Sequence, residues 1–249
     1  MKDNRTVMFT GTPCQVAGLR KYLRKNYENL LLVDIVCHGV PSPMVWKKYL
    51  LEEKWRSSIN NRTKRYAESK IILEKINFRD KSTGWKCYSV LLDFVHISSR
   101  EQRKVSKLSV FPENVYMKAF LSNLSIRPSC YNCKLKAGNS GADITMGDFW
   151  GIDKILPNLD DNKGVSLMIV YNKKAEEWLR DLKGEFVEVA LDKAISCNPS
   201  YVIAARKPIN RDFFFYLLRK MELINVIQFI ESRTLYKRLR RIIYRYIGI

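Results

Sequence analysis

The strongest constraint on the fold is a strand–turn–helix–strand pattern near the start of the chain. Residues 5–26, "RTVMFTGTPCQVAGLRKYLRKN", combine a short apolar run, a Gly-Thr-Pro turn and an amphipathic segment. Residues 29–43, "NLLLVDIVCHGVPSP", form a second apolar run that ends in a Gly/Pro loop. Short apolar runs that alternate with helical segments are typical of domains in which helices cover a sheet.

The alternation continues to about residue 200. Ser42 and Pro43 mark the start of a helix, and residues 56–70 read as a polar surface connection. We predict an α/β (mixed α+β) fold, with a mixed sheet flanked by helices over residues 1–200 and a basic helical extension over 201–249. The further helices are expected over 44–56, 113–124 and 172–184, and the further strands over 71–80, 86–97, 142–151, 164–171 and 185–191.

The chain is strongly basic, with a formal net charge of +19, and this favours an anionic partner. No apolar run approaches the roughly 20 residues that cross a bilayer, and the start lacks a signal-peptide pattern. We therefore expect a cytoplasmic protein, or one that lies peripherally at the inner membrane. The basic extension is expected to dock its apolar face on the domain or, alternatively, on a membrane surface. That face is formed by Leu235, Leu239, Ile242, Ile243 and Tyr246, with Lys237, Arg240, Arg241 and Arg245 off it.

Four of the six cysteines are candidate metal ligands. Cys14 follows the first predicted strand and Cys37 the second, so both thiols lie at one sheet edge if these strands are neighbours. Cys130 and Cys133 form a C-x-x-C pair on a loop that can close over this edge. Four thiolates suit a 4Fe–4S cluster or an all-cysteine zinc site, and the single C-x-x-C favours iron, because zinc ribbons usually present two. Alternatively, Cys14 and Cys37 are small buried core residues.

Other chemistry-bearing residues have weaker signals. Cys87 and Cys197 lie in or beside apolar runs, so we expect buried core thiols. "GTPCQVAG" either binds a flavin pyrophosphate at a helix N-terminus or is a plain strand-to-helix turn. His38 either exchanges a proton beside a redox centre or makes a loop hydrogen bond. The sequence has no G-x-S-x-G elbow, which argues against a hydrolase.

Six ordered blocks resemble the beta-subunit family of coenzyme F420 (deazaflavin) hydrogenases and dehydrogenases over roughly residues 5–215. They are "GTPCQVAGLRKYL", "DIVCHGVPSP", "FRDKSTGW", "RPSCYNCKLK", "ADITMGDFWGI" and "KGVSLMIV". The resemblance implies an iron–sulfur flavoprotein oxidoreductase that relays electrons between a 4Fe–4S cluster, FAD and an organic acceptor. It implies Cys14, Cys37, Cys130 and Cys133 as cluster ligands, His38 and Lys81 as catalytic candidates, and Gly11, Thr12, Gln15, Gly39, Lys136, Asp148 and Trp150 as residues that line the cofactor site.

The resemblance also bears on partners. Family members commonly begin with a ferredoxin-like module that this sequence lacks, so we expect a separate ferredoxin-like electron donor or acceptor and a small-molecule substrate. Some relatives are associated with surface-polysaccharide synthesis, which the basic extension would suit at a membrane. Two alternatives are a non-catalytic partner or scaffold of such a complex and a zinc-containing nucleic-acid-binding module. No nucleic-acid motif supports the latter, and we expect no nucleic-acid partner.

Overall fold

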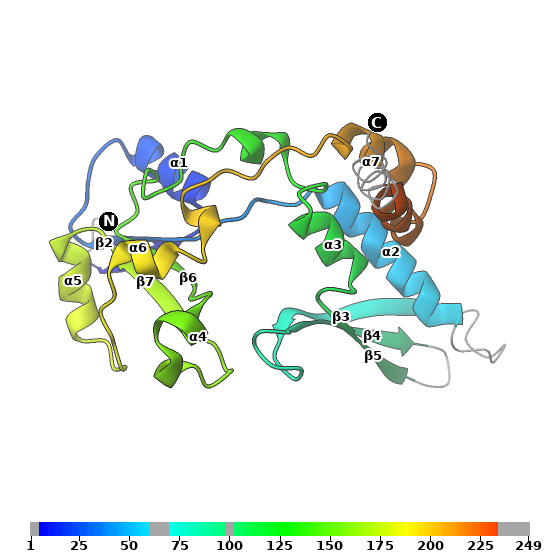
Figure 1. Ribbon diagram of the computed structural model, residues 1–249, viewed down its shortest axis with the longest axis horizontal. Helices are drawn as coiled ribbons and strands as arrows, with labels where there is room; N and C mark the ends of the chain where they lie inside the picture. The colour runs from blue at the N-terminus through cyan, green and yellow to red at the C-terminus, as the bar shows by residue number, and fades with distance from the viewer. Residues whose placement is uncertain (1–4, 60–69, 98–101, 234–249) are drawn as a thin grey trace, which may run out of the picture. The chain divides into compact units, whose positions relative to one another are not determined.

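A computed structural model describes residues 5–59, 70–97 and 102–233 of the chain (Figure 1). These residues divide into two compact units, each made of two separate stretches of sequence. Unit 1 contains the described residues of Met1–Gly39 and Pro128–Ala205, and unit 2 contains those of Val40–Arg127 and Arg206–Ile249. The chain is a mixed α/β protein, as the sequence predicted.

Unit 1 is built on a four-stranded sheet in the order β1-β2-β6-β7. Strands β1 (Val7–Thr10), β2 (Leu30–Ile35) and β6 (Ile144–Asp148) are parallel to their neighbours, whereas β7 (Ser166–Val170) is antiparallel to β6. Helix α1 (Pro13–Leu23) connects β1 to β2, as expected for parallel neighbours. The carboxyl ends of β1, β2 and β6 therefore lie at one edge of the sheet.

Strand β2 is apolar on both faces because helices cover the sheet on both sides. Leu30 and Leu32 pack with Val16 of α1. Leu31 and Val33 point the other way and pack with Ala175 of α5 (Lys173–Arg180). Side chains alternate between the two faces of a strand, so a central strand with two covered faces reads as a continuous apolar run.

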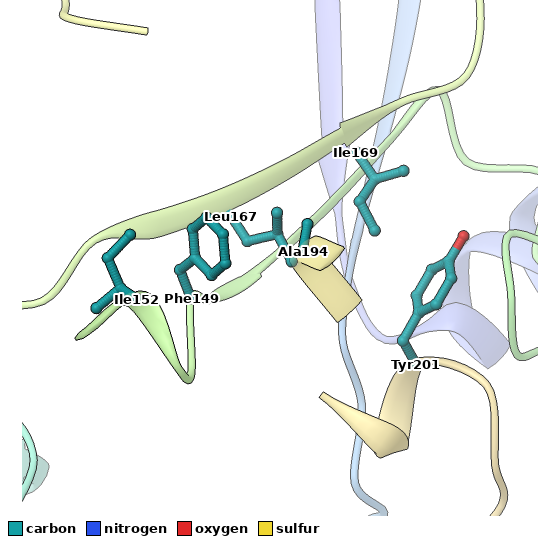
Figure 2. Close-up of a cluster of buried hydrophobic side chains, with 6 residues drawn as sticks. All are labelled: Phe149, Ile152, Leu167, Ile169, Ala194 and Tyr201. Carbon is teal, nitrogen blue, oxygen red and sulfur yellow. The ribbon is translucent and has the colours of Figure 1, made fainter. Parts of the chain in front are cut away.

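A second cluster closes unit 1 beside β7. Leu167 and Ile169 of β7 lie against Ala194 of α6 (Leu191–Ile195) and Tyr201 of the 3-10 helix η4 (Pro199–Tyr201) (Figure 2). The cluster also includes Phe149 and Ile152, the latter in α4 (Ile152–Ile155), which the 3-10 helix η3 (Pro157–Leu159) follows. This packing fixes the segment around Tyr201 against the sheet.

The strand predicted over residues 185–191 is wrong. Residues 185–190 have no regular secondary structure, and α6 begins at Leu191. Phe186 and Val187 are 54% and 51% exposed. The apolar–polar alternation of "EFVEVAL" satisfies the pattern of a strand, but within the described residues no neighbouring strand pairs with its backbone, and a strand requires that partner.

Unit 2 contains an antiparallel sheet in the order β3-β4-β5. The predicted strands at 71–80 and 86–97 are confirmed as β3 (Lys70–Asp80) and β4 (Ser89–Ile97). Strand β5 (Gln102–Val110) was not predicted, because its sequence "QRKVSKLSV" has few apolar residues. The helices are α2 (Pro43–Ile59), α3 (Val115–Leu121) and α7 (Arg211–Leu218), and residues 223–233 are also helical.

Aromatic side chains join the helices of unit 2 to its sheet. The Trp46 ring of α2 lies 5.3 Å from that of Phe78 in β3 and 4.9 Å from that of Tyr116 in α3, measured between ring centroids. Tyr49 stacks on Tyr116 with centroids 5.4 Å apart, and its hydroxyl accepts a hydrogen bond from Asn114. These contacts form the core between the two helices and β3.

Parts of the predicted organisation fall outside the described residues. The apolar face at Leu235–Tyr246 and its basic flank lie there, as do residues 60–69 of the polar connection. The functional division into residues 1–200 and 201–249 stays a prediction, although by packing residues 206–233 group with 40–127. No helix in the described stretches is long and apolar enough to cross a membrane.

A buried carboxylate ties the strands of unit 1 together, and its removal is predicted to destabilise the protein. Asp143 accepts hydrogen bonds from the Leu32 amide at 2.7 Å and the Asn172 amide group at 2.8 Å, and lies 3.0 Å from Lys174. We expect Asp143→Ala to lower the free energy of unfolding by about 2–4 kcal/mol, because it leaves these donors unsatisfied.

Urea unfolding of the whole chain measures this change. The matched control is Asp161→Ala, which removes an exposed ion pair with Lys163 and a hydrogen bond from the Lys163 amide and should cost less than about 1 kcal/mol. Equal losses in the two variants would contradict the structural role assigned to Asp143.

Candidate functional site at the carboxyl edge of the parallel sheet

Three loops that carry predicted site residues leave the same edge of the unit 1 sheet. β1 leads into Gly11–Cys14, β2 leads into Cys37–Gly39, and β6 ends at Asp148, two residues before Trp150. Strands β1 and β2 are parallel neighbours, so the condition for Cys14 and Cys37 to lie at one sheet edge is met. In parallel sheets the carboxyl edge is the usual place for ligand binding, because the loops there converge from neighbouring strands.

Cys14 lies in the first turn of α1, next to a capped helix start. The Gln15 side chain accepts hydrogen bonds from the amide and the hydroxyl of Thr12, at 2.8 and 3.0 Å. Because the Thr12 hydroxyl hydrogen is used there, the Cys14 thiol is the donor in its 3.1 Å contact with Thr12 Oγ1. A Cβ on Gly11 would lie 3.1 Å from Gln15, so glycine leaves room for this cap.

Cys37 is partly buried and lies beside a buried lysine. Lys136 donates hydrogen bonds to the carbonyl oxygens of Cys37 and Ser200, the latter at 2.8 Å. Burial raises the pKa of the Cys37 thiol, whereas the positive charge of Lys136 and a hydrogen bond from the Gly39 amide act to lower it. The environment of Cys37 is therefore set mainly by desolvation, with Lys136 opposing it.

Two other cysteines also act on the pKa of Cys37. After burial and Lys136, the next influences are the negative charges of the Cys130 and Cys14 thiolates, which both raise this pKa. Cys130 lies in the 3-10 helix η2 (Pro128–Asn132), and Cys133 directly follows it. Three of the four predicted ligands thus interact electrostatically, although in the described ranges no three His, Cys, Asp or Glu side chains are grouped to hold a metal ion.

A small pocket opens beside Cys37 and Lys136, and its interior volume of about 10 Å³ has room for no more than about one water molecule. Sequence reasoning missed four polar residues that line it: Asp34, Thr145, Ser200 and Tyr201. The available signal was Asp34, the one charged residue in the apolar run "LLLVDI". Thr145 and Tyr201 gave no signal, because they lie about 110 and 170 residues further along the chain.

The other predicted residues have mixed placements. His38 Nδ1 lies 3.5 Å from the Ser200 hydroxyl, so the loop hydrogen bond considered for it is present. The Asp148 carbonyl accepts hydrogen bonds from Asn198 at 3.2 Å and from the Trp150 amide at 3.0 Å. Lys81 is exposed and belongs to unit 2. The catalytic or cofactor-binding roles of these residues stay predictions.

The expected core positions of two cysteines are wrong. Cys87 and Cys197 are both exposed. Cys87 lies two residues before β4 rather than within it, and Cys197 lies two residues after α6. Cys14 is also exposed, which excludes the alternative of a buried core residue for it. An apolar neighbourhood in sequence does not bury a side chain that lies at the end of an element.

The fold and the site define an α/β domain with cysteine-bearing loops at the carboxyl edge of a parallel sheet. The chain belongs to the family described as the C-terminal part of the coenzyme F420 hydrogenase/dehydrogenase beta subunit, and the match spans residues 4–192. This family is of the oxidoreductase type, and its name refers to coenzyme F420, a redox cofactor distinct from FAD. A search of curated proteins and a search of solved structures each found no match.

Lys136 is predicted to control the reactivity of Cys37 in the cofactor-free protein. Lys136→Met removes the charge that lowers the Cys37 pKa, so this pKa should rise further. Only the thiolate reacts with iodoacetamide, and we therefore expect slower alkylation of Cys37 below its pKa. Mass spectrometry of the Cys37 peptide at several pH values measures the rate.

The matched control is Lys134→Met, which removes an exposed lysine two residues away. It should leave the alkylation profile of Cys37 close to that of the wild type. If Lys136→Met accelerates the reaction instead, the opening of the pocket outweighs the electrostatic effect and the prediction is wrong.

Proposed function

We propose that the protein is an iron–sulfur flavoprotein oxidoreductase that passes electrons between a 4Fe–4S cluster, a flavin-type cofactor and an organic acceptor. The observation that carries the proposal is the parallel pairing of β1 and β2, which brings the Cys14 and Cys37 loops to one edge of the sheet. The charge of Cys130 is also among the influences that raise the pKa of Cys37. Membership of an oxidoreductase-type family supports the same conclusion. Cys133 lies three residues after Cys130 and completes the proposed ligand set.

The donor set fits an iron–sulfur cluster in its chemistry. Cysteine thiolates are the usual ligands of 4Fe–4S clusters, and four thiols from three loops of one unit provide them. We propose Cys14, Cys37, Cys130 and Cys133 as the ligands. When bound, the cluster supplies one-electron transfer, and the flavin couples it to two-electron chemistry.

The surrounding residues have roles that do not depend on the identity of the flavin. Lys136 positions the Cys37 loop and the segment at Ser200 through its two carbonyl contacts. The first turn of α1 contains no acidic residue, so its positive dipole end is suited to a phosphate. We propose that Gly11, Thr12 and Gln15 line this phosphate position, and that His38, Gly39, Asp148 and Trp150 line the redox cofactor.

The family name and the resemblance point to different flavins, so the flavin is a matter for the test. The family name favours coenzyme F420, and the resemblance implies FAD. We propose a ferredoxin-like protein as the electron partner and a small molecule as the substrate. A link to polysaccharide synthesis, and contact of the basic extension with a membrane, remain proposals that stand on the resemblance and the charge.

Anaerobic iron–sulfur reconstitution of the whole chain, followed by iron, sulfide and flavin assays, tests the proposal. We expect about four iron and four sulfide atoms per chain if one 4Fe–4S cluster binds. Cys37→Ser should remove most of the iron, because it deletes one of the four proposed ligands, a partly buried one. Incubation with FAD or coenzyme F420, followed by gel filtration and absorbance, identifies the flavin.

The matched control is Cys87→Ser, since Cys87 is an exposed thiol of unit 2 outside the proposed set. It should retain the iron and sulfide of the wild type. A colourless protein without iron or flavin would refute the proposal. Bound zinc in place of iron would support the structural-zinc alternative, and normal folding with no reduction of an added acceptor would support the scaffold alternative.

A further inference from the structure

A buried carboxylate in the same pocket has no role in the proposed function so far. Asp34 is the last but one residue of β2, is 2% exposed, and lines the pocket together with Cys37 and Lys136. A buried carboxylate is costly unless hydrogen bonds satisfy it. Its surroundings therefore show how the protein uses it.

Three hydroxyl groups connect to this carboxylate in a continuous chain. Thr145 Oγ1 donates to Asp34 Oδ1 at 2.5 Å, and lies 2.9 Å from the Tyr171 hydroxyl. The Tyr171 hydroxyl lies 3.1 Å from that of Tyr201. The four residues come from β2, β6, the end of β7 and η4, all within unit 1.

The direction of the hydrogen bonds follows from the number of hydrogens. Each hydroxyl carries one hydrogen. Thr145 gives its hydrogen to Asp34, so Tyr171 is the donor to Thr145, and Tyr201 is the donor to Tyr171. Every hydrogen points towards the carboxylate, and the Tyr201 oxygen at the end of the chain keeps acceptor capacity for a further donor.

Both ends of the chain are at the pocket, and its middle reaches solvent. Asp34 and Tyr201 line the pocket and are nearly buried, whereas Tyr171 is 36% exposed. Burial first, and the negative charge of Asp34 among smaller influences, raise the pKa of Tyr171. Gly138 has φ +78°, and a Cβ there would lie 2.9 Å from the Tyr171 ring, so the backbone is shaped around that ring.

We propose that Asp34 is the proton acceptor and donor of this site, and that Tyr201, Tyr171 and Thr145 carry the proton between it and an acceptor bound at the open side of the pocket. This inference rests on the proposed function. Reduction of an organic acceptor A to AH⁻ takes two electrons, from a ferredoxin-class carrier, and one proton. Electron carriers of that class supply no proton, so the protein must provide it.

The proton transfer balances at every atom. When Asp34 is protonated, the three hydroxyls turn so that their hydrogens point away from it. Asp34 then gives its proton to Thr145 as Thr145 gives its own to Tyr171, Tyr171 to Tyr201, and Tyr201 to the acceptor. Each hydroxyl loses one O–H bond and gains another, and only Asp34 changes, from carboxylic acid to carboxylate. In the oxidative direction the same steps run in reverse and protonate Asp34. The exposed side of Tyr171 is the route by which the chain exchanges protons with water.

The kinetic test uses the reconstituted whole chain and dithionite-reduced methyl viologen as the electron donor. We expect Thr145→Val, which keeps the shape but removes the hydroxyl, to slow flavin reduction by about 10²-fold, the lower range for loss of general acid–base catalysis. Tyr201→Phe should act similarly and both should increase the solvent deuterium isotope effect. Reduction of the cluster needs no proton through this chain and should keep its rate.

Two variants separate proton transfer from folding. Thr145→Ser retains the hydroxyl and should restore the rate, and Tyr216→Phe removes an exposed hydroxyl of unit 2 and should have no effect. Wild-type rates and isotope effects in both Thr145→Val and Tyr201→Phe, with the cofactors bound, would overturn the inference alone. A wild-type protein that binds neither iron nor flavin would overturn the proposed function and this inference with it.

A second measurement needs no cofactor. Asp34→Asn removes the charge at which the chain of hydrogen bonds ends, so the ¹³Cζ chemical shift of Tyr171 at neutral pH should change. Tyr201→Phe removes the hydroxyl on the other side of Tyr171 and is measured in parallel. An unchanged Tyr171 chemical shift in Asp34→Asn would show that the hydroxyls do not sense the carboxylate, and would overturn the relay.

Discussion

Parallel pairing of β1, β2 and β6 is the constraint on which the candidate site depends. Because the three strands run in one direction, the loops that follow them emerge at one edge of the sheet. Cys14, Cys37 and Asp148 are therefore neighbours of that edge although more than 100 residues separate the first from the last. The apolar contacts of β2 with α1 and α5 hold this arrangement, since they fix the strand from both sides.

The buried polar side chains in and beside the sheet of unit 1 have two different surroundings. Asp143 lies at the amino end of β6 and joins β2 to the start of α5 through well-satisfied hydrogen bonds. Asp34 and Thr145 lie within the same two strands but face the pocket. The contacts of Asp143 hold secondary-structure elements together, whereas Asp34 and Thr145 line a pocket that opens to solvent. The two carboxylates therefore differ in role: Asp143 stabilises the fold, and Asp34 is available for chemistry.

The site and the family membership together favour redox chemistry over the other interpretations of the sequence. The net charge of +19 alone favours any anionic partner. Lys136, beside Cys37, and the positive dipole end of α1 can both interact with an anion. A cluster with thiolate ligands and a flavin phosphate are both anionic, so each would suit this part of the protein. This explanation needs neither nucleic acid nor a structural zinc.

Sequence patterns were sufficient for most elements and for the family, because the hydrophobic period of residues 5–55 and 142–180 matches the helices and strands that form there. They failed at "EFVEVAL" and at β5, where the presence or absence of a pairing partner, not the residue pattern, decides the structure.

The cysteines were recognisable from their loops, whereas the exposure of Cys87 and Cys197 depended on where each element ends. The sequence by itself determined the family and which loops contain the candidate cysteine ligands, and it indicated that β1 and β2 can be neighbours. Only the tertiary structure brought Thr145, Tyr171 and Tyr201 into line with Asp34. The physical reason is that hydrogen bonds between distant segments depend on strand order and packing, and these leave no periodic signal along the chain.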